Sequence, residues 1–153
     1  MSRMMIGGWA AAVLCGLGLA SWAPGDDQPK VKVELRLAET KSAEGLTEAT
    51  VAGTTTKVYL HKEAVITNDD IADAQATVDA NKALAVEITF TKEGQKKIAR
   101  ATEDHKDKPL AILLDGKVIS APVIKSVITD KAMITGNFTK GEVEQLARTI
   151  KGK

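Results

Sequence analysis

The sequence has few aromatic side chains and a single cysteine, and its opposite charges nearly balance. Aromatic residues make up 3% of its 153 positions. That is too few for the stacking platforms that single-stranded nucleic acid needs, or for the aromatic anchors of tight protein interfaces. Lysine and arginine together number 21, against 20 aspartates and glutamates, with no block of like charge. The composition therefore predicts no nucleic-acid partner and only modest contacts with any polypeptide.

Residues that could carry chemistry are also scarce. Cys15 lies in an apolar N-terminal run, so the rest of the chain has no thiol for a disulfide, a nucleophile or a metal site. His61 and His105 lack the spacing of a zinc helix, and we expect both at the surface. Ser120 lacks the G-x-S-x-G turn of a hydrolase nucleophile. The sequence predicts no catalytic residue, no metal site and no cofactor.

The N-terminus begins like a secretory signal. Arg3 precedes MMIGGWAAAVLCGLGLASWA, an apolar run over residues 4–23, and small residues near its end offer cleavage sites. We expect residues 1–23 to form a signal peptide, with cleavage after Ala20 favoured because Pro24 obstructs a cut directly before it. The domain then occupies residues 24–153.

Three other hypotheses exist for this run. At about 20 residues it is long enough to serve as an uncleaved membrane anchor. It could instead form a buried helix, or Cys15 could carry a lipid, although Leu14 stands where lipoprotein signals have a small residue. If the signal is cleaved, we expect the domain to be exported and periplasmic. If the run is an anchor, residues 4–23 tether the domain to the membrane, and the domain still lies outside the cytoplasm.

Alternating apolar residues and capping signals give the expected elements. Thr67 and Asp70 have capping-box spacing, and Ile71, Ala74 and Val78 fall on one helical stripe. Residues 40–57 are polar and Thr-rich and are expected to form a mobile loop. The expected elements are strands over 31–39 and 57–61 that pair as a long hairpin, a helix over 69–80, a strand over 84–91, a helix capped by Thr91, strands over 110–114, 117–120 and 131–138, and a helix after the capping box of Thr139 and Glu142.

This order, β-β-α-β-α-β-β-β-α, predicts an α+β fold with a mostly antiparallel sheet and helices packed on one face. Asp115-Gly116 predicts a tight type I′ turn between LAILL and KVIS, whose alternation is expected to bury one face of a hairpin beneath the helices. Pro122 cannot donate a backbone hydrogen bond and is expected at a strand end, an edge or a bulge.

The segments LAILLDGKVISAPVI, KAMITGNFTKGEVEQLA and VEITFTKEGQKKIARAT together resemble the head subdomain in the first periplasmic domain of SecD, or of fused SecDF. In that family an apolar strand leads into L-D-G, a short strand carries S-x-P-x-I, and A-x-I-T-G-x-F-T/S precedes a helix. VELRLAE and ITNDDIADA resemble the family's opening strand and first helix. The matching positions are Leu114, Asp115, Gly116, Ser120, Pro122, Ile124, Ala132, Ile134, Thr135, Gly136, Phe138 and Thr139.

The resemblance implies a role beside the Sec translocon. The family protein has a periplasmic head that contacts emerging preprotein and membrane helices that use the proton gradient. The sequence ends at Lys153, before the corresponding base subdomain and membrane helices. We therefore expect a free-standing, non-enzymatic head that binds unfolded or exported polypeptide, or Sec translocase components, without proton-driven work.

Two hypotheses of function stay open at this point. The first is polypeptide binding through a sheet edge or an apolar groove, with Pro122, Val123 and Ile124 as candidate contacts because Pro122 marks an incompletely paired strand. The second is an exported adaptor or structural domain that uses the same fold to bind one defined protein. Fold alone does not decide between them, and the sequence does not specify an oligomeric state.

We predict that the native protein begins between Ser21 and Asp26, because the small residues that end the apolar run suit signal cleavage. Mass spectrometry of protein purified from its native envelope would measure this. An intact Met1 in the membrane fraction would contradict cleavage and support the anchor.

Overall fold

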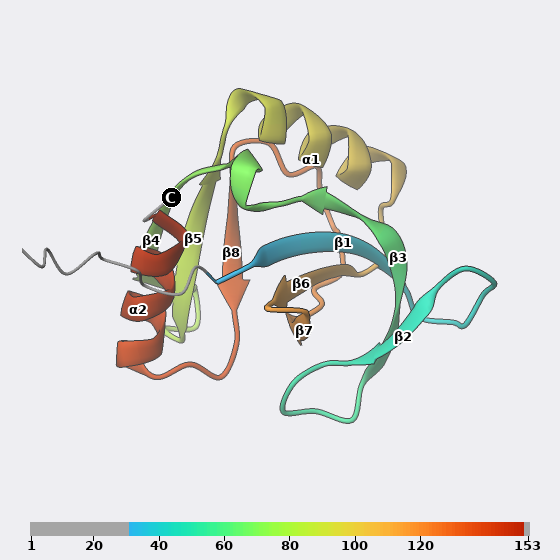
Figure 1. The fold of residues 1–153 in the computed structure, drawn as a ribbon, viewed down its shortest axis with the longest axis horizontal. Helices are drawn as coiled ribbons and strands as arrows, with labels where there is room; N and C mark the ends of the chain where they lie inside the picture. Colours follow the sequence, from blue (N-terminus) through green and yellow to red (C-terminus); the bar gives the residue numbers. More distant parts are fainter. Residues whose placement is uncertain (1–30, 152–153) are drawn as a thin grey trace, which may run out of the picture.

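A computed structural model describes residues 31–151, which form an α+β fold with antiparallel pairing, as predicted (Figure 1). Residues 1–30, with the predicted signal peptide, lie outside the described residues. Within residues 31–151, no helix has the length and apolar character needed to cross a membrane. The elements are β1 (Val33–Glu39), β2 (Thr47–Thr50), β3 (Lys57–Ile66), the short 3-10 helix η1 (Asn68–Asp70), β4 (Ile71–Val78), β5 (Leu84–Phe90), α1 (Lys92–Asp104), β6 (Leu110–Leu114), β7 (Lys117–Ser120), β8 (Lys131–Thr135) and α2 (Lys140–Lys151).

The strands divide between two sheets, where the sequence led us to expect one. A five-stranded sheet has the order β2-β3-β1-β6-β7, and a three-stranded sheet has the order β4-β5-β8. Helix α1 packs against β3 and β5, whereas α2 packs on β4 and β5. Alternation shows which face a strand buries but not which strand lies beside it, so this division could not be predicted from the pattern.

The main core lies between the two sheets and the helices. Its side chains include Leu35 of β1, Ile66 of β3, Phe90 of β5, Ile98 of α1 and Ile150 of α2, all of them fully buried. A second, smaller cluster occupies the other face of the five-stranded sheet. Its buried members are Ala38, Val58, Leu60, Ala111, Leu113 and Val118.

Strand β6 is buried on both faces, whereas we expected only one of its faces to be buried. Leu110 and Ile112 belong to the main core, whereas Ala111 and Leu113 belong to the second cluster. A strand buried on both faces has a continuous apolar run, which is what LAILL is.

The five-stranded sheet curls until its two edges meet at one point. The backbone N–H of Ala52, in the connection between β2 and β3, donates to the carbonyl of Val118 in β7 at 2.8 Å. The segment predicted as a mobile loop therefore contains strand β2 and closes the sheet over the second cluster.

The prediction of a helix over residues 69–80 is wrong. Thr67 and Asp70 do form a capping box, but it caps only η1, and the chain then extends into β4. A β-bulge between Ile71 and Asp73 inserts one extra residue, so Ile71 and Ala74 face the core together. The bulge thereby turns the two-residue period of a strand into an i, i+3 spacing, which imitates a helix.

Asp70 connects the start of β4 to helix α1. Its carboxylate accepts hydrogen bonds from Lys97 Nζ at 2.7 Å and from the backbone N–H of Thr67 at 3.1 Å. Its backbone carbonyl accepts from the N–H of Thr91 at 2.9 Å. A Cβ at Gly94 would lie 2.5 Å from that carbonyl oxygen, so only glycine permits this approach.

Several local predictions are confirmed. β1 and β3 pair antiparallel, although their connection also contains β2, and the side chain of Thr91 accepts from the N–H of Gly94 to cap α1. Leu114 pairs with Lys117 across a two-residue turn, in which both Asp115 and Gly116 have positive φ, 49° and 81°. These values are those that a type I′ turn requires.

We predict that Gly116→Val lowers the free energy of unfolding by about 1–2 kcal/mol, because a β-branched residue is strained at positive φ. Ser120→Ala, in β7 of the same hairpin, is the matched control and is expected to change little. Urea denaturation of both variants measures this, and equal midpoints would contradict the importance of the turn.

We predict that Asp70→Asn destabilises the fold by about 1–3 kcal/mol at neutral pH, because it removes a buried charge that is hydrogen bonded. Burial would raise the pKa of Asp70, but the hydrogen bonds from Lys97 and Thr67 outweigh it and hold this pKa below its usual value. The stability that the ionised carboxylate adds to the fold is fully present above its unfolded-state pKa of about 4. This stability is lost as the pH falls through the lower folded-state pKa.

The difference between the wild type and Asp70→Asn should therefore shrink in acid. Urea midpoints measured from pH 7 down to acid test this, with the exposed neighbour Asp69→Asn as control. A difference that stays constant at low pH would show that the charge of Asp70 is not the cause.

Candidate functional site

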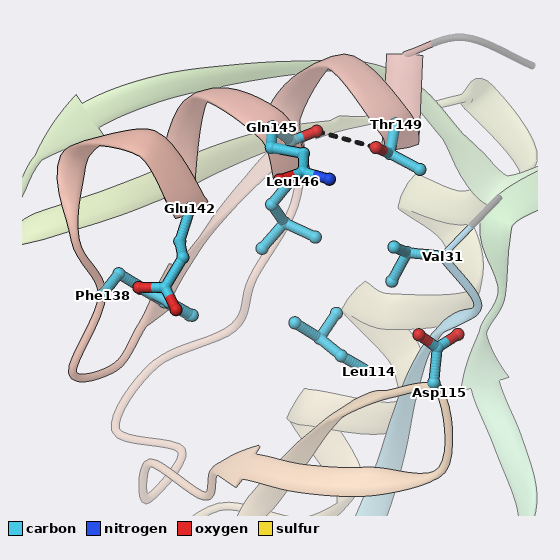
Figure 2. Close-up of a pocket in the computed structure, with 8 residues that line it drawn as sticks. All are labelled: Val31, Leu114, Asp115, Phe138, Glu142, Gln145, Leu146 and Thr149. Carbon is cyan, nitrogen blue, oxygen red and sulfur yellow. Dashed lines mark hydrogen bonds between the residues drawn. The ribbon is translucent and has the colours of Figure 1, made fainter. Parts of the chain in front are cut away.

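A groove lies between helix α2 and the turn of the β6–β7 hairpin, and we call it the α2 groove. Its volume is about 250 Å³. Figure 2 shows Leu114, Val31 and Leu146 directed toward a shared space, with Phe138 and Glu142 at one end and Asp115 at the other. The lining residues are Val31, Leu114, Asp115, Phe138, Glu142, Gln145, Leu146 and Thr149. The groove thus combines an apolar floor with a polar and acidic rim.

Helix α2 forms one wall because of its amphipathic sequence. Val143, Leu146, Ala147 and Ile150 recur on one face and are buried against the three-stranded sheet. The capping box fixes where the helix begins: the N–H of Thr139 donates to Glu142 Oε2 at 2.7 Å, as the sequence predicted. One flank of this helix, with Gln145 and Thr149, is therefore left facing the groove (Figure 2).

The opposite wall is held by paired hydrogen bonds. The N–H of Lys32 donates to Asp115 Oδ1 at 2.8 Å, and the N–H of Asp115 donates to the carbonyl of Lys32 at 2.8 Å. Asn68 accepts from the N–H of Val33 at 2.7 Å and donates to the carbonyl of Val31 at 2.9 Å. These bonds fix Val31 and the hairpin turn next to each other.

The rim of the groove is negatively charged. Among residues 31–151, Asp115 and Glu142 are the two ionisable residues that line it, and no lysine or arginine of this part of the chain does so. The backbone N–H and the hydroxyl of Thr139 lower the pKa of Glu142, so this carboxyl is ionised at neutral pH. A ligand with an apolar group beside a positive charge would complement this surface.

The predicted contact residues Pro122, Val123 and Ile124 lie elsewhere. They follow β7 and run beside residues 107–110, where the N–H of Leu110 donates to the carbonyl of Pro122 at 2.8 Å. Val123 is 45% exposed, whereas Ile124 is 3% exposed and belongs to the main core. Pro122 follows the end of β7, and contact between this segment and a polypeptide stays a prediction.

The two histidines lie beside each other, His61 in β3 and His105 at the end of α1. The rings of His61 and His105 are 6.2 Å apart between centroids, and His61 Nε2 is 3.5 Å from a carboxylate oxygen of Glu39. Lys108 Nζ donates to the same Glu39 oxygen at 2.6 Å. Among residues 31–151, no three histidines, cysteines or acidic residues are arranged to hold a metal ion.

The sequence did not identify the α2 groove. It placed Leu146 on the buried face of a helix and Asp115 in a turn, but nothing in the pattern shows that these residues face each other. The sequence offers one indication of the groove: the Asp115-Gly116 turn and the Thr139–Glu142 capping box each contain an acidic residue. Both residues have local structural roles, so their joint position becomes evident only in the folded chain.

Comparison with known proteins agrees with the resemblance, which the sequence segments between VELRLAE and KAMITGNFTKGEVEQLA carry. A family model described as "SecDF, P1 head subdomain" matches residues 42–153. The chain is 42% identical over 92 residues to protein translocase subunit SecD of Aquifex aeolicus. That match covers 60% of this chain and 18% of the relative.

Solved structures give the same result. A crystal structure of SecDF in a super-membrane-facing form matches with a TM-score of 0.65 and 28% identity, over 80% of this chain and 19% of that one. A second structure, described as a membrane component SecDF that enhances protein export, matches with a TM-score of 0.63 and 28% identity, over 80% of this chain and 62% of that one.

Proposed function

Because the chain belongs to the SecDF P1 head subdomain family, we propose that it binds extended, partly apolar segments of exported polypeptide outside the cytoplasmic membrane. We further propose that this binding assists Sec-type protein translocation, directly or through Sec translocase components. The chain spans 18% of the length of the SecD relative that it matches, so the proposal concerns the head alone.

The observation that carries the proposal is the shape and chemistry of the α2 groove. At about 250 Å³ it lies below the roughly 300–1,000 Å³ of most small-molecule sites. Its floor of Val31, Leu114 and Leu146 suits a few apolar side chains, and its polar ends suit the backbone and charges of a chain that passes through. A passing polypeptide therefore fits this groove better than an enclosed cofactor does.

We propose binding without covalent chemistry. The two ionisable residues of the groove, Asp115 and Glu142, lie toward opposite ends in Figure 2, and their nearest hydrogen bonds serve the turn and the helix cap. A nucleophile, a base and an oxyanion site would have to converge on one point for acyl transfer. The groove residues do not have that arrangement.

The expected affinity is micromolar or weaker. Phe138 is the one aromatic residue among the described residues that line the groove, and aromatic anchors supply much of the energy of tight interfaces. Association must also overcome several kcal/mol of lost freedom, and ordering a flexible peptide adds to that cost. Weak binding suits a partner whose sequence varies and which must be released.

We predict that a disordered peptide rich in leucine and lysine binds the domain, and that Gln145→Trp weakens this binding about ten-fold, or roughly 1.4 kcal/mol, because the indole fills the groove. Glu144→Trp is the matched control, since Glu144 is the exposed neighbour on the same helix but does not line the groove. Titrations followed by backbone NMR measure both affinities and locate the site.

A peptide in which glutamate replaces lysine should bind more weakly than the lysine peptide, because the rim is acidic. Equal weakening by both tryptophan variants would place the site outside the groove. If millimolar lysine peptide shifted no resonance, polypeptide binding would be wrong, and the adaptor hypothesis, with one defined protein partner, would replace it.

A further inference from the structure

Strand β4 is the outermost strand of the three-stranded sheet. It pairs only with β5 among the described strands, and Figure 1 shows it at the margin of the fold beside α2. With 8 residues it is the longest edge strand of the two sheets, since β2 and β7 have 4 and β8 has 5. An edge strand exposes a row of backbone donors and acceptors that can pair with another chain.

The hydrogen-bond pattern shows which residues of β4 point outward. The N–H of Asp79 donates to the carbonyl of Ala83, and the N–H of Phe90 donates to the carbonyl of Asp130 beside β8. Because backbone groups alternate sides along a strand, Asp73, Gln75 and Thr77 pair with β5. The N–H and C=O groups of the alternate residues therefore face away from the sheet, namely those of Ala74, Ala76 and Val78.

The other edges carry protection that the residues of β4 do not supply themselves, although Lys151 of α2 reaches Asp73 of β4 at 3.1 Å. Lys57 of β3 pairs with Glu48 of β2 at 2.8 Å, and Ala52 already bonds the β7 edge at Val118. Strand β8 begins with Lys131, whose ammonium pairs with Glu87 at 2.8 Å. Lysine and proline are the residues that natural edges use against added strands, and residues 63–81 contain neither.

The side chains of β4 favour a particular partner. Val78 is 51% exposed and Ala76 is exposed beside it, so an added strand would cover apolar surface. Of the acidic residues next to β4, Asp70 and Asp73 already pair with lysines of α1 and α2. Asp79, directly after the strand, has no ion pair among residues 31–151, and its negative charge complements a positively charged segment. Bulky side chains do not obstruct the edge, because Ala74 and Ala76 are small.

We propose that the outward-facing backbone of Ala74, Ala76 and Val78 in β4 binds an extended, lysine-containing and acid-poor segment of polypeptide as a fourth strand of the three-stranded sheet. This inference rests on the proposed polypeptide-binding function and adds a second contact for the same partner. Backbone pairing accepts many sequences, since it uses N–H and C=O groups that every residue except proline supplies. On one face of the sheet, alternate side chains of the segment would lie beside Ala76 and Val78. This contact favours apolar residues at every second position of the segment.

Hydrogen exchange of the amides tests the proposal. In the free protein the amides of Asp73, Gln75 and Thr77 should be protected, whereas those of Ala76 and Val78 should exchange fast. A peptide that alternates valine and lysine should slow exchange at Ala76 and Val78 by about ten-fold or more. The same peptide N-methylated at every second residue, on its pairing side, should have no such effect.

A variant pair tests the same edge from the protein side. Ala76→Pro removes the outward N–H but none of the bonds to β5, because proline is tolerated where the N–H faces solvent. It should weaken binding of the valine-lysine peptide about ten-fold or more, whereas Ala76→Val, which keeps the N–H, should bind as the wild type does. Equal urea midpoints for the two variants verify that both fold.

The outcomes separate this inference from the proposed function. Peptide binding with protection only around the α2 groove, or equal binding by Ala76→Pro and Ala76→Val, would overturn strand addition but leave polypeptide binding intact. No binding by any peptide would overturn both. Protection at Ala76 and Val78 that rises with protein concentration and without peptide would assign the edge to a second copy of this chain instead.

Discussion

The position of Asp70 is the constraint on which the arrangement of helix α1 and the three-stranded sheet depends. The residue ends η1 and directly precedes β4. It accepts from Thr91, directly after β5, and binds Lys97 in the second turn of α1. Four parts of the chain therefore meet at one buried residue. The glycine at position 94 lets the helix approach this point, because any side chain there would collide with the Asp70 carbonyl. The carboxylate and the glycine together fix where α1 crosses the sheet.

Local signals predicted local structure well. The Asp115-Gly116 turn, the Thr91 cap and the Thr139–Glu142 capping box depend on a few neighbouring residues, so the sequence specifies them directly. The capping box of Thr67 and Asp70 is equally correct, yet the helix inferred from it is not, because pairing with β5 and a bulge outweigh the local tendency. A one-residue bulge cannot be distinguished from a helical stripe over so short a segment.

Features that join distant segments could not be predicted. The α2 groove brings Val31, Leu114 and Leu146 together, although more than thirty residues of chain separate each from the next. The position of β4 at the edge of its sheet depends on which strands pair, and periodicity carries no information on pairing. Helix α2 separates these two surfaces: Gln145 and Thr149 face the groove, whereas Lys151 reaches Asp73 of β4 at 3.1 Å. One amphipathic helix thus covers the sheet and borders both proposed contact sites.

The bond between Ala52 and Val118 has a consequence for the native-state fluctuations of the five-stranded sheet. Strands inside that sheet are joined by ladders of several hydrogen bonds, whereas a single bond, with a net value of about 0.5–1.5 kcal/mol, joins its two edges. Local opening begins where the fewest contacts must break. We therefore expect the contact between Ala52 and Val118 to open and re-form more readily than the ladders that join the strands.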